Sequence, residues 1–226
     1  MTVKRSLEQS KIFQNFKEIE SGEYHSIIRF YEEYRQQINT LEFDEYFELL
    51  IAYNESLFEI GAYQSYLANC EKALEETILN NIKFYKGVDI FQELLFRKAA
   101  SHYHLLQYDQ SEHILRELIK IDPYNDISIR FLRKCLGRRY PRFVKNTRAV
   151  SVFFFMLAAL IIAIEILFVR HFMELYLPFV EGARNVLFGA GLLFLIGGEV
   201  FNYGRIAAGV NRFAKKVRQD KYKSLS

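Results

Sequence analysis

The sequence predicts an all-α fold in which paired helices come first and two long apolar helices follow. Two observations lead to this prediction. Over residues 1–136, apolar residues recur at spacings of three and four, the period of an amphipathic helix, and the first proline is Pro123. Two apolar runs then lie within residues 149–204, each of about 20 residues and so long enough to cross a bilayer as a helix.

Seven helices are expected in the first 136 residues, and ordinary helix signals separate them. They begin near residues 12, 24, 44, 63, 88, 110 and 127. Gly22 and Gly61 mark two of the turns, and Asn80 to Gly87 is expected to form a longer loop. Pro123 ends the sixth helix because proline cannot continue one, and Asp126 can cap the seventh.

The helices form pairs that are joined by similar turns. The turns read Gly22-Glu23-Tyr24, Gly61-Ala62-Tyr63 and Leu106-Gln107-Tyr108, and their tyrosines are 39 and then 45 residues apart. In the third pair, residues follow the tyrosine at offsets 3, 7, 10 and 15, namely Ser111, Leu115, Leu118 and Pro123.

This pattern resembles the tetratricopeptide repeat, a helix–turn–helix unit of about 34 residues. Ala99 to Asp126 is the clearest match. The second pair matches through Gly61, Tyr63 and Ala73 but has Ile78 where the family has proline, and the first pair matches only through Gly22 and Tyr24. The resemblance implies about three stacked pairs plus a terminal helix over residues 1–136. A generic helical bundle is the alternative interpretation.

The resemblance also implies a concave groove lined by the first helix of each pair. Alignment on the turn tyrosines places these residues there: Glu48, Ile51, Glu55, Phe58, Glu93, Phe96 and Tyr103. Acidic groups among aromatic ones suit a basic peptide in an extended or helical form. The alternative is that the apolar members form the core between repeats and the glutamates are simply hydrated.

The two apolar runs, residues 149–169 and 185–204, are interpreted as a transmembrane hairpin. A buried hairpin in a soluble core is the alternative, but this chain is short for enclosing two such helices. Basic residues gather in a linker, 137–148, and in a tail, 205–226, whereas the connector between the runs is poor in them. Because lysine and arginine favour the cytoplasmic side, both termini are expected there. We expect an integral protein of a bacterial inner (cell) membrane, although an organelle membrane satisfies the same rule.

Each apolar run contains one acidic residue, Glu165 in the first and Glu199 in the second. Ionisable groups within a span are costly and mark functional sites by default. In an antiparallel hairpin these two carboxylates lie at opposite ends, so they cannot pair with each other. We expect Glu165 to approach Arg170 or Arg184, and Glu199 to approach Arg205 or Arg148, with side chains reaching towards the headgroups.

Composition separates two electrostatic parts. Residues 1–129 hold 13 Lys and Arg against 22 Asp and Glu, a balance of −9, while residues 130–226 hold 17 against 5, a balance of +12. The acidic part should repel nucleic acid, and the basic part should attract anionic headgroups. No catalytic or metal-binding motif is found, so we expect no enzyme, no metal and no cofactor. Cys70 and Cys135 are expected to be buried thiols.

These observations favour a membrane-anchored adaptor that presents a helical-repeat domain to a protein partner. The alternative is a subunit of a membrane oligomer, a pore or a transporter, with the repeat domain as its sensor. The second run contains Gly189, Gly191, Gly197 and Gly198, which would allow close packing within the hairpin or in a homo-oligomer. A third option is an enzyme subunit whose catalytic partner is a separate chain.

Overall fold

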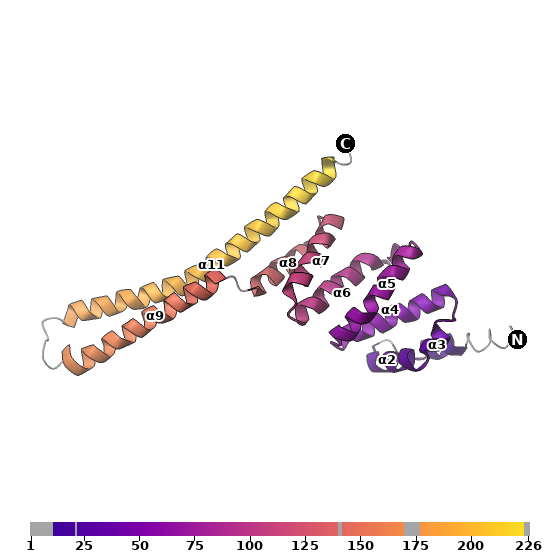
Figure 1. Ribbon diagram of the computed structural model, residues 1–226, viewed down its shortest axis with the longest axis horizontal. Helices are drawn as coiled ribbons and strands as arrows, with labels where there is room; N and C mark the ends of the chain where they lie inside the picture. The colour runs from indigo at the N-terminus through magenta and orange to yellow at the C-terminus, as the bar shows by residue number, and fades with distance from the viewer. Residues whose placement is uncertain (1–10, 21, 140–141, 170–176, 224–226) are drawn as a thin grey trace. The chain divides into compact units, whose positions relative to one another are not determined.

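A computed structural model of the chain describes residues 11–20, 22–139, 142–169 and 177–223 (Figure 1). The chain divides into two compact units, Met1–Ser128 and Ile129–Ser226. Most of the described residues are helical. The prediction that the chain is mostly helical is therefore confirmed.

The first unit is a succession of helices, each packed against the next. Residues 11–17 are helical, and α2 (Tyr24–Glu33), α3 (Arg35–Ile38), α4 (Phe43–Glu59), α5 (Tyr63–Leu79), α6 (Ile90–His104) and α7 (Tyr108–Ile121) follow. The terminal helix α8 (Asp126–Arg138) crosses the division between the units. Helix α2 packs on α4, α4 on α5, α5 on α6, and α6 on α7. All seven predicted helices are present, but the second ends at Glu33 and a further turn, α3, follows it.

The three predicted turns each contain a residue with a positive φ angle. Gly22, Gly61 and Leu106 occupy equivalent positions, and their φ angles are 107°, 77° and 61°. Glycine adopts positive φ at little cost, which explains the first two turns. Leu106 also adopts a positive φ angle, although it lacks the conformational freedom of glycine, and its side chain is exposed. The turn predicted there without a glycine is therefore real.

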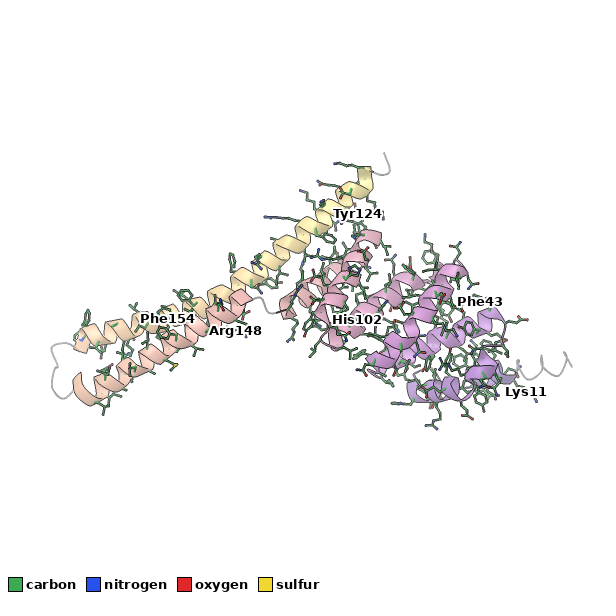
Figure 2. The ribbon with its side chains drawn as sticks, in the orientation of Figure 1. Lys11, Phe43, His102, Tyr124, Arg148 and Phe154 are labelled. Carbon is green, nitrogen blue, oxygen red and sulfur yellow. The ribbon has the colours of Figure 1, made fainter. Side chains whose placement is uncertain are left out.

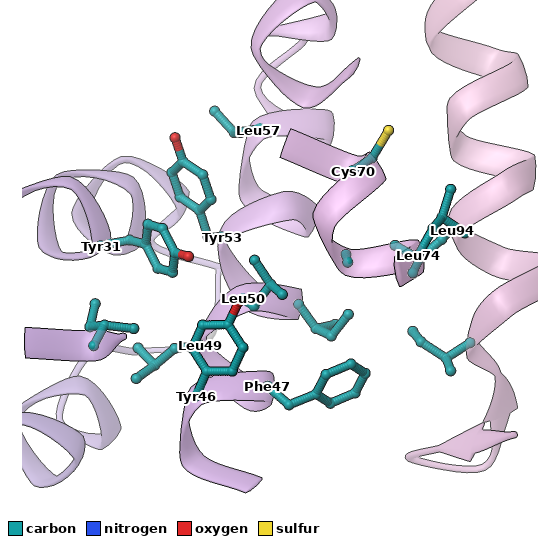
Figure 3. Packing of buried hydrophobic residues seen from close by; sticks show 14 of the residues in the cluster. Tyr31, Tyr46, Phe47, Leu49, Leu50, Tyr53, Leu57, Cys70, Leu74 and Leu94 are labelled. Carbon is teal, nitrogen blue, oxygen red and sulfur yellow. The ribbon is translucent and has the colours of Figure 1, made fainter. Parts of the chain in front are cut away.

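The core of the first unit lies around α4, which is buried on most of its surface (Figure 3). Tyr31 of α2 stacks on Tyr53 of α4, with ring centroids 4.1 Å apart and planes at 11°. Tyr66 of α5 is fully buried, and its hydroxyl donates to the Leu94 carbonyl oxygen at 3.1 Å. Such aromatic packing fixes α4 between its neighbours.

Both cysteines are buried, as predicted from their isolated positions in the sequence. Cys70 has no exposed surface and Cys135 is 1% exposed. Burial raises the pKa of the Cys70 thiol to about 11, so this group is a thiol rather than a thiolate at neutral pH. Both residues therefore act as small apolar packing groups.

The segment predicted as a loop, Asn80 to Gly87, contains part of a small β-hairpin. Strands β1 (Phe84–Tyr85) and β2 (Val88–Asp89) pair in antiparallel fashion, with Tyr85 opposite Val88. The two turn residues, Lys86 and Gly87, have φ angles of 48° and 81°. Positive φ at both central positions is the geometry that matches strand twist in a two-residue hairpin. Sequence periodicity missed the hairpin because each strand has only two residues.

The second unit contains the two apolar helices. Helix α9 (Arg142–Ile164) ends in a π-helical segment, η1 (Glu165–Val169), and α11 (Leu177–Lys223) packs along α9. The first run therefore lies in a helix that begins before residue 149. The second run and the basic residues up to Lys223 form one continuous helix. Lysine and arginine are good helix formers, which explains why the tail continues the helix.

Both helices are long and apolar enough to cross a membrane. The most apolar 18-residue window has a mean hydropathy of 2.7 within Val144–Leu167 and of 1.6 within Pro178–Lys223. Only 17% of the most apolar window of each is buried. Apolar side chains such as Phe153, Leu193 and Val200 instead point outward. The core helix of a soluble protein would bury such residues.

Candidate binding groove

A pocket of about 290 Å³ opens on α4, at the position where the sequence predicts a groove. Helix α4 contributes Glu48, Ile51 and Glu55, and α6 contributes Glu93 and Arg97. The β-hairpin closes one side. Its lining residues are Tyr85, Lys86 and Val88. The pocket therefore combines three carboxylates with apolar and basic groups.

A second pocket of about 460 Å³ continues this hollow towards the N-terminal helices. Its wall includes Phe16, Lys17 and Tyr24. Both pockets are lined by Glu48, Ala52, Glu55 and Lys86. Together they form one groove over α4, called the α4 groove below.

Arg97 lies at the centre of the first pocket and joins two of the predicted glutamates. Its Nε donates to Glu93 Oε1 at 2.7 Å, and its Nη2 donates to Glu55 Oε1 at 3.0 Å. The guanidinium also lies over the Phe58 ring, 5.4 Å from the centroid. Burial lowers the pKa of Arg97, but its hydrogen bonds to the two carboxylates outweigh this effect and raise that pKa above its ordinary value.

Glu48 is held by two ammonium groups from distant parts of the chain. Lys17 Nζ lies 2.7 Å from Glu48 Oε1, and Lys86 Nζ lies 3.4 Å from the same oxygen. Burial raises the pKa of Glu48, but Lys17 and Lys86 outweigh it and hold that pKa below its ordinary value. Glu48 is therefore a carboxylate whose charge is stabilised on the wall of the groove.

The structure brings together four of the seven predicted groove residues: Glu48, Ile51, Glu55 and Glu93. Phe58 instead packs against Tyr63 and Tyr66, with Arg97 above it. Phe96 is half-buried and lines neither pocket of the groove. Tyr103 is buried against the Tyr108 ring, because it lies on the side of α6 that faces the turn. Phe58 and Tyr103 therefore belong to the packing between helices.

Sequence reasoning missed the basic members of the α4 groove. Arg97 follows Glu93 by one helical turn, a spacing that favours an ion pair and could have predicted the contact. Lys17 and Lys86 come from segments far from Glu48 in the sequence, and no local pattern predicts their approach.

The predicted turn residues lie at helix starts and stabilise the pairs by ring contacts. Tyr63 stacks on His104 of the next pair, with centroids 4.5 Å apart. Tyr108 meets Tyr103 nearly edge-on at 5.5 Å. Tyr24 is half-buried and lines the second pocket, and Pro123 is fully buried.

The two acidic residues of the apolar helices both pair with arginines across the hairpin. Arg184 Nη1 of α11 donates to Glu165 Oε2 at 2.9 Å, and the Glu165 side chain is only 2% exposed. Arg148 of α9 (Figure 2) donates from Nε to Glu199 Oε1 at 2.9 Å, and both of these side chains are about half exposed. Of the four arginines considered for these glutamates, Arg184 and Arg148 make the contacts; Arg170 lies outside the described residues.

Small residues and stacked rings hold α9 close to α11. Ser151 Oγ donates to the Gly191 carbonyl oxygen at 2.8 Å, and the ring of Phe154 stacks on that of Phe194 with centroids 5.6 Å apart. A Cβ on Gly191 would lie 2.9 Å from the Phe155 ring. Gly189 and Gly197, by contrast, have open space where a Cβ would lie. Gly198 likewise lies against Thr147 of α9. Two of the four predicted glycines, Gly191 and Gly198, therefore allow α11 to pack closely on α9.

No protein-family model matches this chain, and comparisons with curated proteins and with solved structures give no match either. Among the described residues, no group of three histidine, cysteine or acidic side chains could hold a metal ion. The α4 groove is the site whose geometry can be interpreted further.

Proposed function

We propose that this protein is a membrane-anchored adaptor whose first unit binds a segment of a partner protein in the α4 groove. The observation that carries this proposal is the groove itself, which runs over α4 and presents Glu48, Glu55 and Glu93. A groove between helices of this kind receives an extended or helical peptide. The resemblance to tetratricopeptide repeats and the positive φ angle at the same position of the three turns support the same assignment.

The chemistry of the groove favours a partner segment that carries lysine or arginine. The three carboxylates are fixed on α4 and α6, whereas two of their cations, Lys17 and Lys86, have side chains that are 50% and 70% exposed. Exposed ion pairs contribute little stability, so a ligand cation can replace them at small cost. The balance of −9 over residues 1–129 would also attract a basic segment over a longer range.

The second unit supplies the anchor in this proposal. Its two apolar helices would span the membrane and leave the first unit and the C-terminal part of α11 in the cytoplasm. The basic residues along that part of α11 would contact anionic headgroups. These residues are Arg205, Arg212, Lys215, Lys216, Arg218, Lys221 and Lys223.

The groove assignment is tested by neutralising its carboxylates in the full-length protein. Replacing Glu48, Glu55 and Glu93 with glutamine leaves Lys17, Lys86 and Arg97 without their partners, so the groove becomes positive. We expect crosslinking and affinity purification from native membranes to lose a basic partner by at least tenfold, as expected when several charge-assisted contacts are removed, each of about 1 kcal/mol or more.

The matched control changes three other glutamates that form ion pairs outside the groove: Glu71, Glu112 and Glu117. It carries the same change in net charge. If both triple variants lost the partner equally, general electrostatics would explain capture and the groove would not. If neither variant lost it, binding at the α4 groove would be wrong.

A membrane oligomer is the second candidate, and the open glycine positions favour it. Gly189 and Gly197 are free of contacts within the hairpin and could approach another copy closely. The two acidic residues weaken this candidate, because Glu165 and Glu199 are paired with arginines of the same hairpin rather than presented to a channel.

A further inference from the structure

We propose that the β1–β2 hairpin is a latch on the α4 groove, in which Lys86 occupies the place of the partner's basic side chain. This inference rests on the proposed function and adds to it how the ligand is recognised. The partner segment would place a lysine or arginine on Glu48 and displace Lys86. The Lys86 side chain would then turn away from the groove.

The position of Lys86 carries the inference. Its ammonium group contacts Glu48 Oε1 at 3.4 Å, and Lys86 lines both pockets of the groove. It therefore lies where the two pockets meet. A peptide that runs the length of the groove must pass this point, so it must move the Lys86 side chain.

The Lys86 side chain can move while the hairpin backbone stays in place. Tyr85, next to the turn, meets the Phe47 ring of α4 edge-on at 5.6 Å, and within the hairpin the Ile90 amide donates to the Lys83 carbonyl oxygen at 3.3 Å. The first contact holds the hairpin against α4, and the second closes its base. At the tip, the Lys86 side chain is 70% exposed. An ion pair of this kind exchanges readily with another cation.

Glu48 can accept a cation of the partner segment and remain paired with a lysine of its own chain. Lys17 also contacts Glu48 Oε1, at 2.7 Å, so the carboxylate stays paired while Lys86 leaves. The pKa of Lys86 is raised, since Tyr85 and Glu48 outweigh the effect of burial, which lowers it. Lys86 is thus a charged competitor for the site under ordinary conditions.

The sequence places this hairpin in the longest interval between turn tyrosines. Tyr63 and Tyr108 are 45 residues apart, against 39 for the preceding pair. The extra length comes from α5, which has 17 residues against 10 in α2. Residues 80–89, between α5 and α6, contain the hairpin that lines the groove. Helix packing alone does not need them, because α5 contacts α6 directly.

The test measures how Lys86 affects the affinity for a basic peptide. Peptides are selected from a random phage-displayed library on the full-length protein in detergent, in parallel on wild type and on Lys86→Ala. The dissociation constants of the synthetic peptides are then measured. Lys86→Ala should bind about fivefold more tightly, since an exposed ion pair is seldom worth more. Lys86→Arg keeps the charge and should bind like wild type.

Two further variants make the result specific. Lys83→Ala removes a charge from the same segment, but Lys83 lies over the Phe84 ring rather than on Glu48, so affinity should stay unchanged. In a Glu48→Gln background, Lys86→Ala should give no gain, because the contested carboxylate is absent.

Each outcome decides something different. A gain for Lys86→Ala alone supports the latch. Weaker binding by Lys86→Ala would show that Lys86 contacts the ligand, and an equal gain for Lys83→Ala would show an effect of net charge; either result overturns the latch and leaves the groove as the binding site. If neither wild type nor Lys86→Ala selects a basic peptide, the latch and the proposed function both fail.

Discussion

Replacing Arg184 with alanine is expected to destabilise the apolar hairpin by about 3 to 5 kcal/mol. The Glu165 side chain is 2% exposed, and Arg184 is the cation that pairs with it at 2.9 Å. Removal of Arg184 takes a cation away from a buried carboxylate, and a buried charge is costly in an apolar surrounding. The free energy of unfolding can be measured by titrating the protein in mixed detergent micelles and following its helical signal.

The control for this prediction is Arg148→Ala, which removes the other arginine of the hairpin. Arg148 and Glu199 have side chains that are 48% and 45% exposed, so this loss should be below about 1 kcal/mol. The double variant Glu165→Met/Arg184→Met should recover most of the stability, since apolar residues can replace a buried ion pair. Equal losses for Arg184→Ala and Arg148→Ala would refute a special role for the buried pair.

Gly198→Val is expected to separate α9 from α11, whereas Gly197→Val should leave them packed. A Cβ on Gly198 would overlap Thr147 Oγ1 and lie 2.9 Å from Thr147 Cβ, so the helices must move apart. Nothing lies within 4 Å of a Cβ on Gly197. Overpacking of this kind costs about 1 to 3 kcal/mol, and the same detergent titration measures it.

The two glycine variants are closely matched because the positions are adjacent and carry the same substitution. Depth in the membrane and helix propensity are therefore nearly equal for both. If Gly197→Val were as destabilising as Gly198→Val, the face of α11 that contacts α9 would be assigned wrongly. If only Gly197→Val had an effect, its open face would be in contact with another copy of the chain.

The helical course of the chain could be predicted because its signals are local. The turn at Leu106 shows this best. It has no glycine, but the tyrosine two residues later marks the same turn as Gly61 and Tyr63 do, and the backbone angles agree. The sequence does not show where the second span ends within α11. The change from apolar to basic residues alters the surroundings of the helix, but it does not end the helix.

The candidate site was predictable only in part, and the reason is physical. Alignment of the helix pairs on their turn tyrosines predicts one groove for Glu48, Glu55 and Glu93, and all three line the same pocket. The lysines that pair with Glu48 could not be predicted. Lys17 reaches Glu48 across 31 positions of the sequence, and the Lys86 contact depends on a hairpin of two-residue strands. Long-range ion pairs are fixed by tertiary structure, which no short spacing pattern reports.

The central claim is that the two apolar helices cross the membrane and hold both ends of the chain on one side. Protease protection of distinct epitope tags at the N- and C-termini, in sealed membrane vesicles of known orientation, tests it most directly. We expect both tags to be cut in vesicles that expose the cytoplasmic face, and both to be protected in the opposite orientation. Protection of one tag while the other is cut, or release of the protein by alkaline extraction, would contradict the account.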